Sequence, residues 1–206
     1  MLIMLPLMVD LTGKNCVVVG AGQIALNKVR SLLKEKAQVT VISLNACEEI
    51  KALEARGEIK LLNRKYELED GASAFLVIAA TNDPKENKKI ANHLKSTTLV
   101  SDASDTQTGN FHIPSNVKRG KLHLSVSTNG ASPKLAKRIK EKWELDYDQD
   151  YLEYMEFLYK VRSTLKQLPL SKEEKNSILE EILDNQFKAS QQYRNEFYEK
   201  LLKNLT

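Results

Sequence analysis

The sequence predicts an α/β protein in which a doubly wound parallel sheet is followed by a short α+β segment and a helical C-terminal region. Strand and helix patterns alternate over about the first 110 residues, which is typical of parallel strands joined by right-handed crossovers. Apolar and polar residues then alternate with a period of two at 121–130, and a helical pattern runs from Tyr147 onward. We therefore expect domains at residues 1–113, 114–146 and 147–206.

The strands of the predicted sheet are short apolar runs separated by helical patterns. They lie at residues 15–20, 38–43, 59–66, 74–81 and 98–104. The fourth run, AFLVIAAT, is strongly apolar, as expected for a central strand that is buried on both faces.

The helices between these strands carry recognisable start and stop signals. They lie at residues 24–36, 45–57 and 83–97. Gly57 ends the second helix, while Asp83 and Pro84 open the third, because an aspartate cap and a proline in the first turn both favour a helix start.

The second half of the chain follows different patterns. The alternating segment predicts an antiparallel or half-exposed strand. The helix at 131–144 has Ser132 as its N-cap and Pro133 at its first position. In the helical tail, Pro169 breaks the pattern, and the capping box SKEE at 171–174 restarts it.

The composition, 42% hydrophobic and 28% charged over 206 residues, is ordinary for a globular protein. The apolar start MLIMLPLMVDL lacks the basic flank and the cleavage site of a signal peptide, and no apolar run reaches the 18 or so residues that span a bilayer. Cys16 and Cys47 follow no metal spacing, and we expect Cys16 to be a buried free thiol. These features predict a soluble, cytoplasmic protein with no membrane partner.

The net charge of +4 is distributed unevenly. Between Phe111 and Lys142 there are eight basic residues and a single acidic one, Glu141. Either an anionic partner binds near this region or the basic face is simply solvated. Nucleic acid is not expected, because no aromatic residues are interleaved with the basic ones and no docking motif is present.

The first strand pattern ends in Gly20-Ala-Gly22-Gln-Ile-Ala25, and a helical pattern begins at once. This is the dinucleotide-binding fingerprint with alanine in place of the third glycine, a permitted variant. The first glycine makes the tight turn, the second lets a pyrophosphate approach the backbone, and Ala25 keeps the helix close to the strand. The N–H groups of the helix N-terminus would bind the phosphates. The alternative is a tight turn with no ligand.

The acidic residue that usually ends the second strand and binds the ribose is missing, since the segment reads VTVISLN. Ser43 or Asn45 could bond a ribose hydroxyl, but neither separates NAD from NADP by charge. Thr81 and Asn82 follow the fourth strand, at the edge where such sheets bind ligands. The predicted cofactor-binding residues are Gly20, Gly22, Gln23, Ile24, Ser43, Leu44, Asn45, Thr81 and Asn82.

The loop SDASDTQTGNFHIPS follows the fifth strand and carries Asp102, Asp105 and His112. A carboxylate or an imidazole here could accept the proton that is released when a hydride leaves a substrate. Each aspartate could equally be a turn or cap residue, and His112 could be a core histidine. His93 is expected at the surface and His123 on the polar face of its strand, so the three scattered histidines predict no metal site.

Four stretches stand in this order along the chain: LPLMVDLTGKNCVVVGAGQIALNKV, VIAATND, NFHIPS and VSTNGASPKLAKRIKE. They resemble the siroheme synthase family, whose members are precorrin-2 dehydrogenases, some of which also act as sirohydrochlorin ferrochelatases. The resemblance covers roughly residues 3–145, and the helical tail agrees in position and length. The segment GASP before a basic helix is the most telling piece, because Rossmann proteins in general lack it.

This resemblance implies an NAD-binding Rossmann domain, then a segment for dimerisation and substrate binding, then a helical domain. It implies the NAD-dependent oxidation of precorrin-2, an anionic tetrapyrrole, to sirohydrochlorin in siroheme or cobalamin synthesis, by a homodimer. The basic excess described above agrees with a substrate that carries many carboxylates. The substrate-binding residues that we expect are Ser127, Thr128, Asn129, Lys137 and Arg138.

The family's catalytic aspartate falls at Ser104, with Asp105 beside it, when residues are counted back from Phe111. The expected catalytic residues are therefore Asp105, Ser104 and His112. Because metal insertion needs a base that removes pyrrole protons, this departure favours a dehydrogenase without strong ferrochelatase activity. Two alternatives remain open: a bifunctional dehydrogenase and ferrochelatase, and a nucleotide-sensing regulatory domain.

Overall fold

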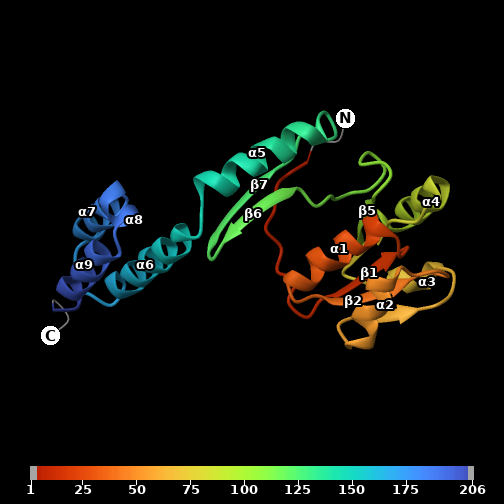
Figure 1. Ribbon diagram of the computed structural model, residues 1–206, viewed down its shortest axis with the longest axis horizontal. Coiled ribbons are helices and arrows are strands. Elements are labelled where there is room, and N and C mark those ends of the chain that lie inside the picture. The colour runs from red at the N-terminus through yellow and green to blue at the C-terminus, as the bar shows by residue number, and fades with distance from the viewer. Residues whose placement is uncertain (1–3, 204–206) are drawn as a thin grey trace. The chain divides into compact units, whose positions relative to one another are not determined.

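The computed structural model describes residues 4–203, and the chain divides after Ile113 into two compact units (Figure 1). The first unit carries a parallel sheet with helices, and the second carries a two-stranded sheet with helices. None of the helices between residues 4 and 203 has the length and apolar character that a bilayer-spanning segment needs.

The sheet of the first unit has five parallel strands in the order β3-β2-β1-β4-β5. They are β1 (Asn15–Val19), β2 (Gln38–Ile42), β3 (Lys60–Leu62), β4 (Leu76–Ala79) and β5 (Leu99–Asp102). The chain order reverses between β1 and β4. The crevice outside the carboxyl ends of these two strands is therefore the position where doubly wound sheets bind ligands.

Helices cover both faces of this sheet. They are α1 (Gln23–Lys34), α2 (Glu48–Ala55), α3 (Leu68–Ala72) and α4 (Pro84–Leu94). Neighbouring residues of a strand point to opposite faces, so Val18 packs in one core cluster with α1 and α2, and Val17 packs in a second cluster with α4. Both clusters are almost fully buried, which makes the central strands a rigid base for the loops at their ends.

The second unit begins with an antiparallel hairpin of β6 (Ser115–Arg119) and β7 (Leu122–Val126). Gly120, at φ 56°, and Lys121 form its two-residue turn, a position where a positive φ favours glycine. The helix α5 (Pro133–Asp146) follows, and the Oγ of Ser132 accepts a hydrogen bond from the N–H of Leu135 at 3.2 Å.

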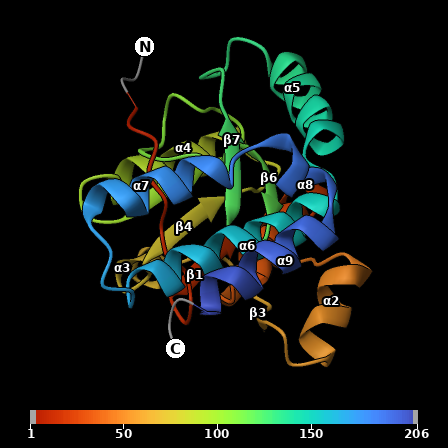
Figure 2. The ribbon, with the colours of Figure 1, turned by 90° about the vertical axis from the view of Figure 1, so that its left-hand side faces the viewer.

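The rest of the second unit is helical (Figure 2). Its helices are α6 (Asp150–Leu165), α7 (Lys172–Glu181), α8 (Asn185–Ala189) and α9 (Gln191–Lys203). Figure 2 shows α6 and α9 side by side, in agreement with their contacts. Phe157 of α6 stacks on Phe187 and meets Phe197 edge-on, while the hydroxyl of Tyr154 donates to the carbonyl of Ile182 at 2.9 Å. These residues give the helices a core of their own.

The predicted fold class is confirmed: a doubly wound parallel sheet, a short α+β segment and C-terminal helices. The predicted caps at Asp83 and Ser132 are present, and so is the capping box at Ser171 and Glu174. The division after Ile113 groups residues 114–206 into one unit. The finer boundary at Tyr147 stays a prediction.

Three elements differ from the sequence analysis. The strand expected at 59–66 is only three residues long, because its neighbour β2 ends at Ile42 and the chain beyond Leu62 turns away from the sheet edge. The five-residue helix α3 is too short to show a helical period. The strand β6 has a polar sequence, SNVKR, in which only Val117 is buried, so it gave no apolar signal.

The two cysteines are free thiols, as expected, and only Cys16 is buried. Burial in β1 raises the pKa of the Cys16 thiol to about 11. Because the thiolate is the reactive form, this side chain is inert at neutral pH and acts as part of the core.

Candidate functional site

A cleft of about 690 Å³ lies at the carboxyl edge of the parallel sheet. Its walls come from the segments that follow β1, β2, β3 and β4. All the predicted cofactor-binding residues line it except Gln23 and Ile24, which lie in the exposed first turn of α1. The fold thus brings together residues that are far apart in the sequence, such as Gly22 and Asn82, which are separated by 60 positions.

The structure explains the two fingerprint glycines, Gly20 and Gly22, in different ways. Gly20 has φ 104°, and a Cβ atom there would collide with the backbone carbonyl of Ala80. The fold itself therefore requires this glycine. Gly22 has an ordinary φ of −89°, and a Cβ atom there would meet nothing within 4 Å. Because the protein's own packing does not need Gly22, the open space beside it fits a bound phosphate group.

The N-terminus of α1 faces this space without a cap of its own. Gly22 is the N-cap residue, no side chain bonds the first backbone N–H groups, and no acidic residue stands in the first turn. By contrast, side chains cap α4, α5 and α7. Unsatisfied N–H groups and the positive end of the helix dipole together make an anion-binding site.

The β2 end of the cleft is polar but carries no negative charge. The hydroxyl of Ser43 donates to the backbone carbonyl of Asn45 at 2.9 Å, which shapes the loop between them. The N–H of Cys47 bonds the carbonyl of Ala21 at 3.1 Å and ties this loop to the glycine turn. Leu44 is 58% exposed, so it presents an apolar surface on which a base could stack.

The β4 end is held by Asn87 of α4, a polar side chain that is only 1% exposed. Its Oδ1 accepts hydrogen bonds from the N–H of Thr81 at 3.0 Å and from the Thr81 hydroxyl at 2.7 Å. Its Nδ2 donates to the carbonyl of Thr81 at 3.2 Å and to the Ser104 hydroxyl at 3.4 Å. One amide therefore joins the cleft wall at Thr81 to the loop that follows β5.

Asn87 was not among the functional residues that we expected, although the sequence carries a signal for it. Asn87, Ile90, Ala91 and Leu94 have the i, i+3, i+4, i+7 spacing of one helix face, and all four are buried. An asparagine in such an apolar stripe needs several hydrogen-bond partners, since an unpaired buried amide is costly. That requirement points to a structural or functional polar contact.

Asp102 organises the loop that carries the predicted catalytic residues. This aspartate is 3% exposed and ends β5. Its Oδ1 accepts from the N–H of Ser104 at 2.8 Å, from the Ser104 hydroxyl at 2.5 Å and from the N–H of Asp105 at 3.2 Å. Its Oδ2 is buried and has no hydrogen-bond partner within the described chain. A buried carboxylate with one unsatisfied oxygen is an available proton acceptor.

Asp105 lies in a different environment. It is exposed, and its two carboxylate oxygens accept from the N–H of Gln107 and the hydroxyl of Thr108, each at 2.9 Å. These two hydrogen bonds, of which the backbone one contributes most, lower the pKa of the Asp105 carboxyl. A lower pKa makes the carboxylate a weaker base, and the geometry is that of a turn residue.

Two of the three histidines, His93 and His123, lie where the sequence suggested. His112 is half-buried, between Phe111 and Ile113, which pack against the core of the first unit. His93 is exposed on α4, and His123 is exposed on β7.

In the second unit, the predicted substrate residues Ser127, Thr128 and Asn129 form a tight turn between β7 and α5. The N–H of Asn129 bonds the Ser127 hydroxyl at 3.1 Å, and the Thr128 hydroxyl accepts from the N–H of Ser132 at 3.0 Å. Asn129 has a positive φ of 48°, which asparagine tolerates better than most residues. The turn therefore leads directly into the capped start of α5.

The two predicted basic residues of α5 differ in their surroundings. Lys137 forms an ion pair with Glu141 at 3.7 Å, so part of its charge is balanced. Arg138 has no carboxylate partner among the described residues, nor do Lys134 and Lys142 one turn before and after it. Residues at i, i+4 and i+8 lie on one helix face, so these three form an exposed cationic stripe.

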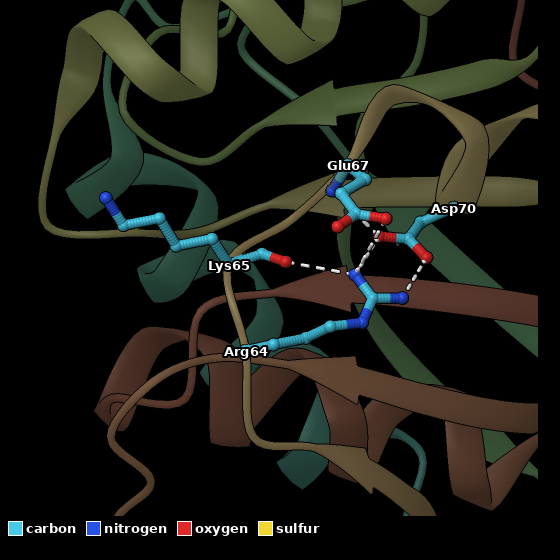
Figure 3. A network of polar contacts seen from close by, with 4 residues as sticks. All are labelled: Arg64, Lys65, Glu67 and Asp70. Carbon is cyan, nitrogen blue, oxygen red and sulfur yellow. Dashed lines mark hydrogen bonds and ion pairs between the residues drawn. The ribbon is translucent and has the colours of Figure 1, made fainter.

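The segment after β3 contributes a further ion pair near the cleft, which Figure 3 shows. Arg64 binds Asp70 through two hydrogen bonds, at 2.8 Å from Nη1 and 2.6 Å from Nη2. Its Nη1 also donates to the carbonyl of Lys65 at 3.0 Å. The hydrogen bonds from the Arg64 guanidinium hold the pKa of Asp70 below its usual range. Asp70 in turn accepts from the N–H of Glu67 at 2.8 Å, and this bond helps to start α3.

Comparisons with known families agree with this arrangement. Residues 7–115 match the family described as putative NAD(P)-binding, residues 119–144 match the sirohaem biosynthesis protein central family, and residues 151–197 match the SirC C-terminal domain family. The precorrin-2 dehydrogenase of Priestia megaterium is 39% identical over 97% of this chain and 99% of its own length. The precorrin-2 dehydrogenase of Bacillus subtilis strain 168 is 39% identical over 77% of this chain and 98% of its own.

The chain belongs to the siroheme synthase family of precorrin-2 dehydrogenases. The fold agrees over nearly the whole length, because the solved structure titled SirC, precorrin-2 dehydrogenase, superimposes with a TM-score of 0.84 at 38% identity. That match covers 97% of this chain and all of the other. The family, the oxidoreductase class and NAD as the cofactor, all expected from the sequence, are confirmed.

The two glycines give a prediction that separates folding from binding. We expect Gly22→Asp to keep or raise the thermal midpoint of the ligand-free protein, because aspartate is a good N-cap residue and has room there. It should weaken NAD binding by about tenfold or more, equivalent to about 1.4 kcal/mol, because the carboxylate repels the pyrophosphate. Titration calorimetry and a melting curve of the same sample measure both. Gly20→Ala should instead lower the unfolding free energy by at least about 1–3 kcal/mol through backbone strain.

The buried amide gives a second prediction. Asn87→Ala should lower the unfolding free energy by about 1–3 kcal/mol, because it leaves the polar groups of Thr81 unpaired, and it should also weaken NAD binding at the cleft wall. Asn92→Ala, an exposed change on the same helix, serves as the control and should alter neither quantity. Equal NAD affinity in the Asn87 and Asn92 variants would contradict a role for this amide in shaping the cleft.

The Arg64–Asp70 pair gives a pH-dependent prediction. Because the pKa of Asp70 is lowered in the folded protein, its stabilising contribution is present above the ordinary value of 3.8 and is lost as the pH falls through the folded-state pKa. Asp70→Asn should therefore lower the urea midpoint at pH 7, and the difference from the parent protein should shrink below pH 3.8 and vanish below the folded-state pKa of Asp70. Glu69→Gln, a neighbouring exposed change, is the control. A difference that persists at low pH would exclude the ion pair as its cause.

Proposed function

We propose that this protein oxidises precorrin-2 to sirohydrochlorin with NAD as the hydride acceptor. The observation that carries this proposal is the likeness to precorrin-2 dehydrogenases over nearly the whole length of both chains. The open space beside Gly22 supports it, because the packing of the chain does not require a glycine at that position, whereas the close approach of a pyrophosphate would.

The residues of the cleft fit a dinucleotide. Gly22 and the uncapped N-terminus of α1 would hold the pyrophosphate, Ser43 and Asn45 a ribose, and Thr81 and Asn82 the nicotinamide half. When bound, the cofactor supplies the hydride acceptor. Gln23 and Ile24 remain candidate contacts from the first turn of α1. The role of the chain is to bind and orient the cofactor and the substrate and to provide a route for the released proton.

The reaction removes a hydride and a proton from the substrate, so a proton acceptor is needed beside the cleft. The geometry favours Ser104 backed by Asp102, since the exposed hydroxyl donates to the buried carboxylate at 2.5 Å. A proton taken up by Ser104 could pass to Asp102 along this bond. Asp105 and His112 remain candidates, although hydrogen bonds within the turn already occupy both oxygens of Asp105.

The substrate carries many carboxylates, and we propose that the second unit binds them. Arg138, with the unpaired lysines of the same stripe, offers positive charge without a competing carboxylate, while Lys137 is partly balanced by Glu141. The turn at Ser127, Thr128 and Asn129 adds hydroxyl and amide groups. Long-range attraction between opposite charges would also speed the encounter with the substrate.

We further propose that the protein acts in the cytoplasm as a homodimer joined through residues 114–146. The sheet β6–β7 has only two strands, and such a sheet is marginal alone, so each strand has an edge that a second copy could extend. Sedimentation of the full chain at two concentrations tests this state. A monomer at both concentrations would oppose it.

The decisive experiment is an anaerobic assay with precorrin-2 and NAD that follows sirohydrochlorin absorbance. Asp102→Asn should lower kcat by about 10²–10⁴, the usual effect of losing a proton acceptor, with little change in KM. Asp105→Asn is the matched control and should cost much less. The reverse order would assign the role to Asp105.

The same assay separates the alternatives. Ferrous or cobaltous ion added after the oxidation should be inserted no faster than in the absence of protein, whereas faster insertion would establish a bifunctional enzyme. If the protein binds NAD but forms no sirohydrochlorin, the dehydrogenase proposal fails and a nucleotide-sensing role takes its place.

A further inference from the structure

We propose that the cleft contains a phosphate subsite at its β2–β3 end, formed by Lys65 together with Ser43, so that the protein accepts NADP as well as NAD. This inference rests on the proposed function only in placing a dinucleotide in the cleft. The ligand class is a phosphate monoester on the 2′ position of the adenosine ribose.

The position follows from the order of the strands. In a dinucleotide-binding sheet, the adenosine ribose lies at the end of β2, where an acidic residue normally binds its hydroxyls. Here that position is Ser43, whose N–H donates to the carbonyl of Leu62 at 3.1 Å. The chain that leaves β3 is therefore adjacent to the ribose position, and Arg64 and Lys65 both line the cleft with Ser43.

The charged residues that line this end of the cleft are both positive. The cleft residues contributed by the segments after β2 and β3 include two cations and no carboxylate: Ser43, Leu44, Asn45, Ala46, Cys47, Arg64, Lys65 and Tyr66. The acidic cleft residues, Asp83 and Glu86, lie after β4. Burial raises the pKa of Tyr66 to about 12, so this phenol adds no negative charge at neutral pH. A 2′-phosphate thus meets no repulsion from the lining of this end.

The two cations differ in their ion-pair partners. Arg64 is held by Asp70 through both terminal nitrogens, and Glu67 lies 3.9 Å from it. Its charge is already balanced. Lys65 is exposed and pairs with no carboxylate among the described residues. Figure 3 shows its side chain extending away from the Arg64–Asp70 pair.

Arg64 also positions the backbone of Lys65. The Nη1 of Arg64 donates to the backbone carbonyl of Lys65 at 3.0 Å, as Figure 3 shows, so the ion pair fixes the backbone from which Lys65 projects. The ammonium group then needs only to order its own side chain when it meets a phosphate. The Ser43 hydroxyl can serve either ligand, since a hydroxyl both donates to a phosphate and bonds a ribose 2′-OH.

The test is a binding measurement with the full-length protein, NAD and NADP, by titration calorimetry at low ionic strength. The parent protein should bind the two dinucleotides with dissociation constants within about tenfold of each other. Lys65→Glu should raise the ratio of the NADP to the NAD dissociation constant by about tenfold or more, because attraction becomes repulsion. Ser43→Asp should raise the same ratio by restoring the missing acid.

Lys60→Glu is the matched control. Lys60 is an exposed residue at the other end of β3 and does not line the cleft, so the same change of charge should leave the ratio unaltered. NAD binding with NADP weaker by more than about 100-fold, or a ratio that Lys65→Glu and Lys60→Glu change equally, would overturn the subsite but leave the proposed function standing. Failure to bind either dinucleotide would overturn both.

Discussion

The close approach of Gly20 to the backbone of Ala80 is the constraint on which the cleft depends. The N–H of Gly20 bonds the carbonyl of Ile42 at 2.9 Å, and the N–H of Ala80 bonds the carbonyl of Val19 at 2.8 Å. These bonds close the ends of β1, β2 and β4 against one another at the point where the strand order reverses. No side chain fits between Gly20 and Ala80, so the cleft loops that follow β1, β2 and β4 begin at fixed positions.

Buried hydrogen bonds then extend this fixed geometry from the strand ends to the loops around the cleft. Thr81 continues from Ala80 into the cleft wall, and Asn87 binds its N–H, hydroxyl and carbonyl. The same amide reaches Ser104, whose hydroxyl is bound to Asp102 at the end of β5. The proposed cofactor wall and the proposed proton acceptor are thus parts of one hydrogen-bonded network. In a low-dielectric interior such a network holds its geometry more strongly than separate surface contacts would.

The sequence predicted the features that rest on local pattern. The strands β1, β2, β4 and β5, the helix starts at Asp83 and Ser132 and the glycine turn each have a signal within a few residues, and these were located correctly. Features set by distant contacts were harder to see. The short β3 depends on where its neighbour β2 ends, and the role of Asn87 depends on which loops fold over it.

The candidate site also combines features that have a local sequence signal with features that depend on distant contacts. The family resemblance led us to expect a catalytic position at Ser104 and drew attention to Asp105 beside it. Only the three-dimensional arrangement shows that both carboxylate oxygens of Asp105 accept hydrogen bonds within its own turn, whereas Asp102 is buried behind Ser104. Exposure and hydrogen bonding distinguish these carboxylates, and neither property is written in their order along the chain.

The uncapped N-terminus of α1 makes the stability of the folded protein depend on its ligand. A helix that begins at glycine, with no side-chain cap and no acid in its first turn, lacks a stabilising element that α4, α5 and α7 possess. A bound pyrophosphate would supply this element from outside, as a cap that the chain does not encode. Any ligand that binds only the folded state raises its stability in proportion to the logarithm of its concentration. The persistence of the folded enzyme is therefore tied to the supply of dinucleotide, and a cell depleted of cofactor would hold this protein closer to unfolding.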